Sequence, residues 1–265
     1  MKLSEPNKIL ITGAAGGIGA ALAQAYASPG RTLILQGRDL ISLHALTRQC
    51  ERSGAKVETQ QVELTDAPQL TDWLKRLQQQ APPDMVIVNA GVSSDVGRLG
   101  RGEPWPAIRQ VLDVNLISAM SLVETLLPAM RQRGSGQIVL VSSLSAYFGL
   151  PLTPSYCASK AALKAYGEAL RGWLGPYGIA VNVVLPGFVA STMSERFPGP
   201  KPFIMPPQRA ATIIKRSLAR NRARIAFPAP LSWGMWWLGI LPPVLSLWLL
   251  RHLGYAPVSH CDPDA

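Results

Sequence analysis

Tyr156 and Lys160 are two residues whose types and spacing could support proton transfer. They stand four apart in the stretch SYCASK, at the start of a predicted helix, so their side chains share one helix face. A phenol with its ordinary pKa of about 10 is a poor base at neutral pH, but a neighbouring ammonium group favours the phenolate and lowers that pKa. The pair therefore predicts acid–base chemistry on a substrate oxygen. A solvated surface pair is the alternative that the spacing alone favours.

A serine adds a third polar group to this region. Ser143 directly follows the apolar run QIVLVS at 137–142, which is typical of a buried strand. Its hydroxyl could donate a hydrogen bond to a carbonyl or alcohol oxygen. Ligands gather at the carboxyl ends of parallel strands, where this serine is expected to lie.

A glycine-rich stretch, TGAAGGIG at 12–19, lies between a predicted strand and a predicted helix. Gly13 would permit a tight turn, Gly17 would let the backbone approach a pyrophosphate, and Gly19 would let the helix pack closely on the sheet. Amide groups at the start of the helix would face the phosphates. The motif therefore indicates a dinucleotide site, with a glycine-rich connection that binds nothing as the alternative.

The second predicted strand ends in LQGRD, and this ending bears on the choice of dinucleotide. Gly37 stands at the strand tip, where an acidic residue would bind a ribose 2′-hydroxyl, and Arg38 follows it. A guanidinium group suits a 2′-phosphate, which favours NADP(H) over NAD(H). Asp39, next to it, weakens the argument, because one of the two residues could simply cap the following helix.

The order of the predicted elements gives the fold class. Short apolar runs alternate with helical patterns, which predicts βαβ units and an α/β fold: a Rossmann-like, doubly wound, mostly parallel sheet with helices on both faces. We expect strands at 8–12, 32–36, 56–62, 84–89, 137–142 and 179–185, and helices at 17–28, 40–53, 67–80, 104–130 and 155–174. A helix at 208–221 and a short strand in RIAFP are expected to follow.

Six motifs occur in an order that resembles one known family. They are TGAAGGIG, NAG at 89–91, Asn115 in DVNL, Ser143, YCASK and PG at 186–187. Together they resemble the short-chain dehydrogenase/reductase family over about residues 7 to 192. The resemblance implies hydride transfer between a nicotinamide and a carbonyl or alcohol.

The resemblance also implies a role for each matching residue. Tyr156 would exchange the proton of the substrate oxygen, Lys160 would hold the nicotinamide ribose, Ser143 would orient the substrate, and Asn115 would support a proton-carrying water. The implied cofactor-binding residues are Gly13, Ala15, Gly17, Ile18, Gly19, Arg38, Glu63, Asn89, Ala90, Gly91, Tyr156, Lys160, Pro186, Gly187, Val189 and Ser191.

Two positions depart from the family pattern. Glu63, in VELTD, replaces the aspartate that often contacts adenine, which puts that contact in doubt. Ser191 replaces a threonine and keeps the hydroxyl. Neither change affects the groups expected to transfer the proton.

The C-terminal part lies outside the resemblance. Residues 190–207 are rich in proline and large apolar side chains, which predicts a lid-like loop over an apolar pocket, the alternative being a plain surface connection. Residues 231–250 carry no charge, but Pro242 and Pro243 interrupt them, so two short apolar helices are more natural than one straight span. We therefore expect a catalytic domain at 1–228 and an apolar helical extension at 229–265.

Three roles stay open for the apolar extension. It could be buried, either packed on a neighbouring subunit or closing the substrate pocket, or it could span a membrane. Its tryptophans and flanking arginines also suit peripheral contact with an anionic membrane through 231–253.

Composition limits the other function classes. The net charge of +10 favours anionic partners, but the arginines of 209–224 lack interleaved aromatic residues, so we expect no nucleic acid ligand. Three separated cysteines and a crowded C-terminal group (His252, His260, Cys261, Asp262, Asp264) predict neither a disulfide framework nor a metal site. The N-terminal sequence lacks the layout of a signal peptide, which predicts a cytoplasmic protein, peripheral at the inner face of a membrane if the extension binds lipid.

The combined interpretation is an NADP(H)-dependent oxidoreductase. Its substrate would be an apolar, lipid-like carbonyl or alcohol, and the family resemblance implies a homo-dimer or homo-tetramer. The alternative is a non-catalytic dinucleotide-binding protein that serves regulation or scaffolding.

Overall fold

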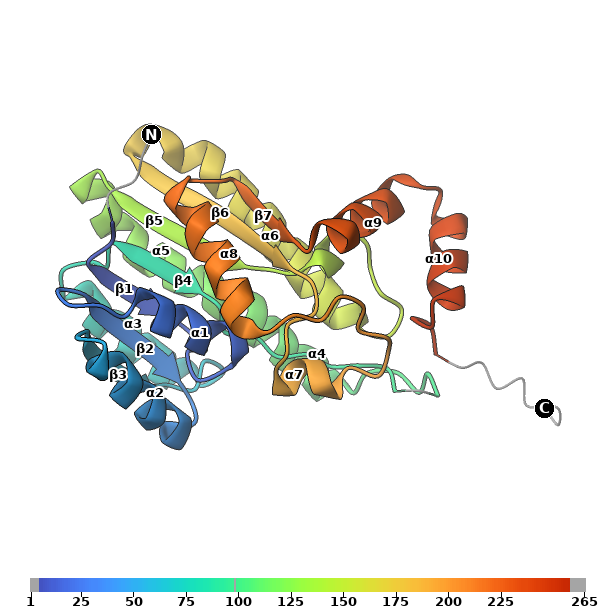
Figure 1. Cartoon of the computed structure of the whole chain (residues 1–265), viewed down its shortest axis with the longest axis horizontal. Helices are drawn as coiled ribbons and strands as arrows, with labels where there is room; N and C mark the ends of the chain where they lie inside the picture. Colours follow the sequence, from blue (N-terminus) through green and yellow to red (C-terminus); the bar gives the residue numbers. More distant parts are fainter. Residues whose placement is uncertain (1–4, 98, 258–265) are drawn as a thin grey trace.

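A parallel sheet of seven strands forms the centre of the molecule (Figure 1). The computed structural model describes residues 5–97 and 99–257. The strand order is β3-β2-β1-β4-β5-β6-β7, and every pair is parallel. The strands are β1 (Lys8–Ile11), β2 (Thr32–Gly37), β3 (Lys56–Gln61), β4 (Met85–Val88), β5 (Gly136–Val141), β6 (Ile179–Pro186) and β7 (Arg224–Phe227).

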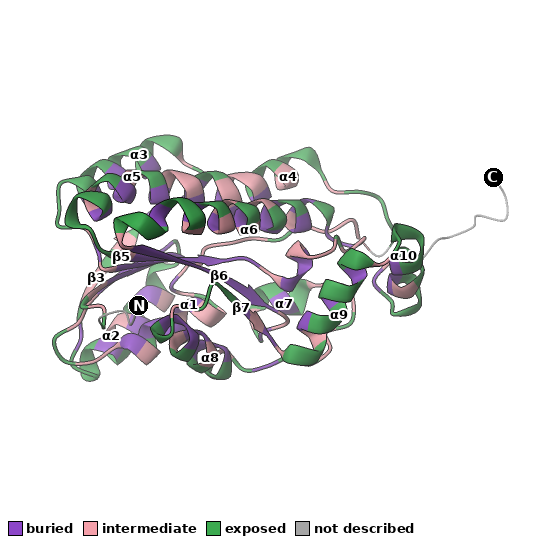
Figure 2. Cartoon of the chain, turned by 90° about the horizontal axis from the view of Figure 1, so that it is seen from above, coloured by how far each residue is buried: buried purple, intermediate pink, exposed green. Residues whose placement is uncertain are grey.

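Helices cover both faces of this sheet (Figure 2). One layer holds α1 (Gly17–Tyr26), α2 (Leu40–Arg52) and α8 (Pro207–Ala219), and the other holds α3 (Ala67–Gln78), α4 (Trp105–Leu112), α5 (Ser118–Arg133) and α6 (Pro154–Leu174). The predicted α/β fold with a doubly wound parallel sheet is therefore confirmed.

The strands serve two separate cores because successive side chains point to opposite faces. In β1, Ile9 and Ile11 pack with α1, α2 and α8, whereas Leu10 packs into the core on the opposite face. All three side chains are fully buried. Strands buried on both faces need continuous apolar runs, which is why KILI and MVIV read as strands despite lacking alternation.

Two helical regions differ from the sequence-based expectation. The helix expected at 104–130 is divided, because a π-helical segment, η1 (Asp113–Ile117), separates α4 from α5. The region expected as a loop at 190–207 contains a short helix, α7 (Thr192–Arg196), and Val189 forms an isolated parallel bridge with Met205. The division at η1 was not predicted, because hydrophobic periodicity does not distinguish a π-helical segment from a continuous α-helix.

The apolar segment near the C-terminus forms two helices, α9 (Ala229–Ile240) and α10 (Pro243–His252), which we call the α9–α10 hairpin. Pro242 precedes the second helix, and the Ser246 hydroxyl donates a hydrogen bond of 2.8 Å to the carbonyl of Leu238. The hairpin stands at the end of the sheet, away from the N-terminal strand (Figure 1). The predicted break at the prolines is thus confirmed.

A membrane-crossing helix is a separate question from this hairpin. Within the described residues, the one helical stretch long and apolar enough to cross a bilayer is Trp105–Arg133. Half of the 18 most apolar consecutive residues of this stretch is buried inside the chain, as in the core helix of a globular domain.

Candidate active site

The predicted site residues meet at the carboxyl edge of the sheet. Chain crossovers leave β1 in one direction and β4 in the other, so the strand order reverses between these two neighbours. A crevice for a ligand forms at such a reversal in doubly wound sheets. The glycine loop follows β1, the NAG motif follows β4, and Ser143 follows β5.

The glycine loop leaves no room for larger residues. A Cβ on Gly13, whose φ is +61°, would lie 2.8 Å from the Cα of Ala90, and one on Gly19 would lie 2.4 Å from the carbonyl oxygen of Gly13. A Cβ on Gly17 would lie 3.0 Å from the Cβ of Ser191. Helix α1 begins at Gly17 without a side-chain cap, so its first amide groups are available to an anion. This bare, close-packed cradle fits the diphosphate of a dinucleotide.

Hydrogen bonds fix the loop to its neighbours. The Asn89 side-chain amide donates to the carbonyls of Thr12 and Gly13, both at 3.1 Å, while the Thr12 hydroxyl accepts from the amides of Asn89 and Ala90. From β2, the Gln36 side-chain carbonyl accepts from the amide of Gly13 at 3.0 Å. The family resemblance pointed to Asn89 as a cofactor-binding residue, but sequence reasoning missed Gln36, which no motif distinguishes.

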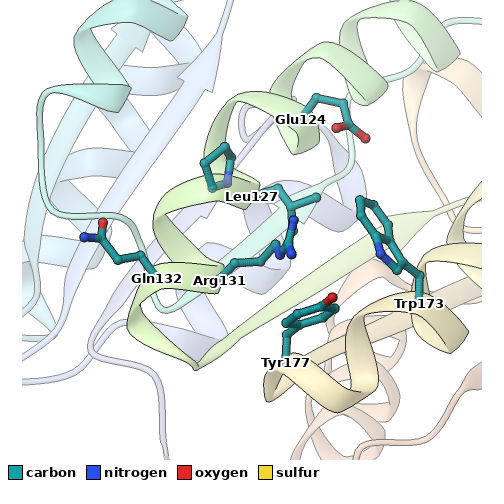
Figure 3. A pocket seen from close by; sticks show the side chains of 7 residues that line it. Glu124, Leu127, Arg131, Gln132, Trp173 and Tyr177 are labelled. Carbon is teal, nitrogen blue, oxygen red and sulfur yellow. The ribbon is translucent and has the colours of Figure 1, made fainter.

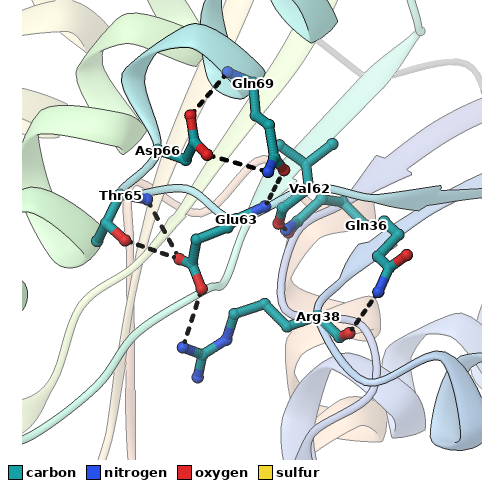
Figure 4. Close-up of polar contacts among 8 residues, drawn as sticks. Gln36, Arg38, Val62, Glu63, Thr65, Asp66 and Gln69 are labelled. Atoms are coloured by element: carbon teal, nitrogen blue, oxygen red, sulfur yellow. Dashed lines mark hydrogen bonds and ion pairs between the residues drawn. The ribbon is translucent and has the colours of Figure 1, made fainter.

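Arg38 and Glu63 face each other at the tips of β2 and β3 (Figure 4). The Arg38 guanidinium lies 3.3 Å from the Glu63 carboxylate, which also accepts hydrogen bonds from the amide and hydroxyl of Thr65. Burial raises the pKa of Glu63, but the bonds from Thr65 and the charge of Arg38 outweigh it, so this pKa lies below its usual value. Asp39 accepts from the amides of Ile41 and Ser42, so its carboxylate caps α2. The guanidinium of Arg38 is therefore paired with Glu63 and not with Asp39, and it is the more exposed member of that pair.

Tyr156, Lys160 and Ser143 come together where α6 packs on β5. The Lys160 ammonium donates to the carbonyl of Val141 at 2.9 Å and lies 5.7 Å from the centre of the Tyr156 ring. The Ser142 hydroxyl donates to the carbonyl of Lys160 at 2.7 Å, which ties helix and strand together a second time. The spacing that predicted a shared face is thus realised in the fold.

The pKa values in this group differ from the sequence-based expectation. Burial raises the pKa of Tyr156 to about 12, and a hydrogen bond with Ser143 opposes only part of that rise. Burial lowers the pKa of Lys160 to about 8. Lys160 alone therefore does not lower the pKa of the tyrosine, because burial of the phenol dominates. At neutral pH the phenol keeps its proton, as a proton donor requires.

Asn115 occupies the π-helical segment η1 and is fully buried. Its side-chain oxygen accepts from the amide of Val92 at 2.8 Å, and its amide donates to the carbonyl of Val92 and the hydroxyl of Ser159. A Cβ on Gly91 would lie 3.3 Å from both Asn115 Oδ1 and Lys160 Nζ. Gly91 thus lets these two side chains approach the loop after β4.

The PG turn after β6 lies against both the catalytic loop and the C-terminal hairpin. A Cβ on Gly187 would lie 2.8 Å from Leu231 of α9 and 3.4 Å from Leu144, the residue after Ser143. Farther along, Ser191 caps α7: its hydroxyl accepts from the amide of Ser194 at 3.2 Å. Ser191 therefore faces Gly17 of the glycine loop, whereas Gly187 faces Leu144 and α9.

Glu103 is a residue of this region that sequence reasoning missed. Its carboxylate accepts from the backbone amide of Ser155 at 2.9 Å and from the Ser155 hydroxyl. Ser155 precedes Tyr156 in the first turn of α6, whose own N-cap, Thr153, makes no capping hydrogen bond. Glu103 thus caps α6 from a distant loop, a contact that no local sequence signal reveals.

A shallow groove of about 510 Å³ lies away from these residues, between α5 and α6 (Figure 3). Arg131 lies over the ring of Tyr177 at 4.3 Å and near that of Trp173 at 5.6 Å. The groove between α5 and α6 contains none of the predicted site residues. Among described residues there is also no group of three metal-ligating side chains, and residues 260–264 of the crowded terminus lie outside the description.

Known proteins resemble this chain in sequence and in fold. The family model of short chain dehydrogenases matches residues 7–200. An uncharacterized oxidoreductase of Myxococcus xanthus is 33% identical over 220 residues, which cover 83% of this chain and 86% of that protein. The 3-oxoacyl-(acyl-carrier-protein) reductase of Thermotoga maritima is 32% identical over 196 residues, 73% of this chain and 78% of that protein. A short-chain dehydrogenase from Sphingobium yanoikuyae, solved with NADPH, superimposes with a TM-score of 0.79 at 26% identity, covering 96% of this chain and 98% of that one.

Replacing Glu103 should weaken the start of α6. Glu103→Ala removes the acceptor of the Ser155 amide and hydroxyl. We expect the free energy of unfolding, measured in urea, to fall by about 1–2 kcal/mol. Turnover should fall with it, because Tyr156 is the next residue. Glu103→Gln keeps an acceptor oxygen and should recover most of both losses. Equal losses in the two variants would contradict the capping role.

The buried lysine should make stability depend on pH. The folded-state pKa of Lys160, about 8, lies below its ordinary 10.5, so between these values the unfolded chain binds more protons and stability rises with pH. Relative to Lys160→Met, the wild-type protein should gain about 2–3 kcal/mol between pH 8 and pH 10 in urea unfolding. Lys75→Met, at an exposed lysine, is the control and should show no such trend. If the difference in unfolding free energy between the wild-type protein and Lys160→Met does not change with pH, the pKa of Lys160 is not lowered in the folded protein.

Proposed function

Because this chain belongs to the short-chain dehydrogenase/reductase family, we propose that it transfers hydride between NADP(H) and a carbonyl or alcohol of an apolar small molecule. The chain is an NAD(P)-dependent oxidoreductase with a Rossmann-like fold. The observation that carries the proposal is the meeting of Tyr156, Lys160 and Ser143 beside the glycine loop at one edge of the sheet.

The proposed roles follow from the chemistry of each group. The bound nicotinamide supplies or accepts the hydride. Tyr156 gives its proton to the substrate oxygen in reduction and takes it back in oxidation, while Ser143 holds that oxygen by a hydrogen bond. Lys160, whose ammonium is fixed by the carbonyl of Val141, binds the ribose of the nicotinamide. Asn115 keeps the loop after β4 in place for proton exchange with solvent.

The preference for NADP(H) rests on the tip of β2. Asp39 is occupied as the cap of α2, and the Arg38 side chain is 54% exposed beside Glu63. A guanidinium group there binds a 2′-phosphate, while a glycine at 37 offers no carboxylate to a 2′-hydroxyl. The Sphingobium protein that superimposes on this chain was solved with NADPH, which supports the same choice.

The apolar substrate is inferred from the residues beyond Ser143. Leu144 belongs to a third hydrophobic cluster with Leu185, Met235 and Leu238, and Phe197 of the 190–207 region packs against it. A cluster of this kind favours an aliphatic or fatty-acyl ketone over a sugar. The Thermotoga relative is a 3-oxoacyl reductase, which supports an acyl ketone.

The partners proposed for the chain follow from the family and from its surface. We infer a homo-dimer or homo-tetramer, with cytoplasmic location. Peripheral contact with an anionic membrane through 231–253 is supported by the exposed tryptophans of this segment, with Trp233 at 70% exposure.

The proposal predicts a specific loss in Tyr156→Phe. With a panel of ketones, aldehydes and alcohols scored by nicotinamide absorbance, the wild-type protein should turn over apolar members. Tyr156→Phe should bind NADPH normally yet lose about a thousandfold or more in kcat, because the proton donor is gone. Tyr166→Phe, on the same helix but bonded to Glu124, should keep its activity. Retained turnover in Tyr156→Phe would overturn the mechanism, and no turnover by the wild-type protein would favour the non-catalytic alternative.

Cofactor choice should change in Arg38→Leu. Loss of the charged partner of the 2′-phosphate should raise the KM for NADPH about tenfold or more and leave the KM for NADH nearly unchanged. Arg48→Leu, at an exposed arginine on α2, serves as the control. If both cofactors are affected equally in Arg38→Leu, Arg38 does not recognise the 2′-phosphate.

A further inference from the structure

The outer surface of the α9–α10 hairpin is apolar, unlike that of an ordinary surface helix. On α9, Trp233, Trp236 and Trp237 are exposed, and on α10, Val244, Leu247 and Trp248. Helix α8 follows the usual pattern, because its exposed positions carry polar residues such as Gln208, Arg209 and Arg216. An exposed apolar surface of this continuity marks a contact with a partner or a membrane.

The hairpin is held to the protein by its inner side, so the exposed side chains are not left over from poor packing. Met235 and Leu238 of α9 and Leu250 of α10 are buried in the third hydrophobic cluster, together with Tyr255. The Ser246–Leu238 hydrogen bond joins the two helices. The tryptophans therefore project from a seated pair of helices.

The same inner side forms part of the wall of the candidate active site. Leu231 of α9 is the residue nearest to the missing Cβ of Gly187, in the PG turn, and Leu144 contacts the same point. A Cβ on Gly239 would lie 3.0 Å from the carbonyl of Tyr147, in the loop between Ser143 and α6. One pair of helices thus contacts the reaction site on one side and exposes apolar residues on the other.

The charges around the apolar surface are basic. Residues 229–257 contain no aspartate or glutamate, and Arg251 and His252 end α10 on the exposed side. A Cβ on Gly254 would lie 3.3 Å from Pro200, the residue before Lys201, at the base of the hairpin. Apolar side chains with flanking cations complement an anionic lipid surface.

We propose, on the basis of the proposed function, that the α9–α10 hairpin docks on anionic lipid and that the active site takes its apolar substrate from that surface. With twelve and ten residues, the helices reach about 18 and 15 Å, too short to cross a hydrocarbon core of about 30 Å. They lie in the interface, where tryptophan is favoured. Docking places the wall that contains Leu231 next to the lipid, so a lipid-dissolved ketone reaches the site without crossing water.

The first experiment measures binding of the full chain to sedimented vesicles of phosphatidylcholine, with and without phosphatidylglycerol. We expect binding to the anionic vesicles that weakens as salt is added. Trp233→Glu should weaken it about tenfold or more, because a carboxylate enters the apolar interface. Trp173→Glu makes the same change at an exposed tryptophan 17 residues beyond Tyr156 on α6, about 25 Å along the helix, and should bind as the wild-type protein does.

The second experiment measures turnover of two ketones with NADPH, one long-chain and dissolved in the vesicles, the other short and water-soluble. Anionic vesicles should raise kcat/KM for the long-chain ketone several-fold and leave the short ketone unchanged. In Trp233→Glu the increase should vanish while turnover of the short ketone persists, which also shows that this variant is folded.

Different outcomes identify which claim fails. Absence of vesicle binding, or equal binding by Trp233→Glu and the wild-type protein, overturns docking on lipid. A change in oligomeric mass in Trp233→Glu without a change in vesicle binding also overturns docking on lipid, because a second copy then covers the surface.

Docking without a vesicle effect on the long-chain ketone overturns only the claim that the substrate is taken from the lipid. Turnover of neither ketone by the wild-type protein overturns the proposed function, and a selective loss of binding in Trp233→Glu would still support docking.

Discussion

The arrangement of the active site depends on burying one ammonium group against the end of a strand. The Lys160 side chain donates to the carbonyl of Val141, and the Lys160 carbonyl accepts from Ser142, so α6 is bound to β5 at two successive points. This double contact sets the position of Tyr156 relative to Ser143. Burial also has an electrostatic cost, because the charged ammonium loses its hydration. That cost appears as the lowered pKa of Lys160. Stability at this point has been exchanged for a fixed geometry.

The glycine loop differs from the group around Lys160, because close packing and not charge determines which residues it can contain. Gly13 and Gly19 approach neighbouring backbone so closely that no side chain is tolerated, and Asn89 closes the loop with two hydrogen bonds. Charge enters only at the far end, where Arg38 and Glu63 meet. The glycine loop is therefore closely packed, whereas Arg38 and Glu63, which we propose distinguish one dinucleotide from another, are partly exposed side chains.

Sequence patterns were sufficient for the central strands, because buried parallel strands require uninterrupted apolar runs such as MVIV at β4. They also located Tyr156 and Lys160, whose contact is local and follows from helical spacing. What they missed depends on distant packing. Glu103 reaches Ser155 across 52 residues, and the direction of the Tyr156 pKa depends on how deeply the fold buries the phenol. The π-segment at 113–117 escaped detection because its apolar pattern is that of an ordinary helix.

The contact between Leu231 and Gly187 has a consequence for how such a protein diversifies. A terminal appendage is normally free to be exchanged, because it leaves the reaction chamber untouched. Here α9 packs against the turn after β6, which also meets the residue next to Ser143, so an exchanged tail would alter the candidate active site together with the outer surface of the hairpin. A shortened chain that stops after β7 would leave that turn uncovered.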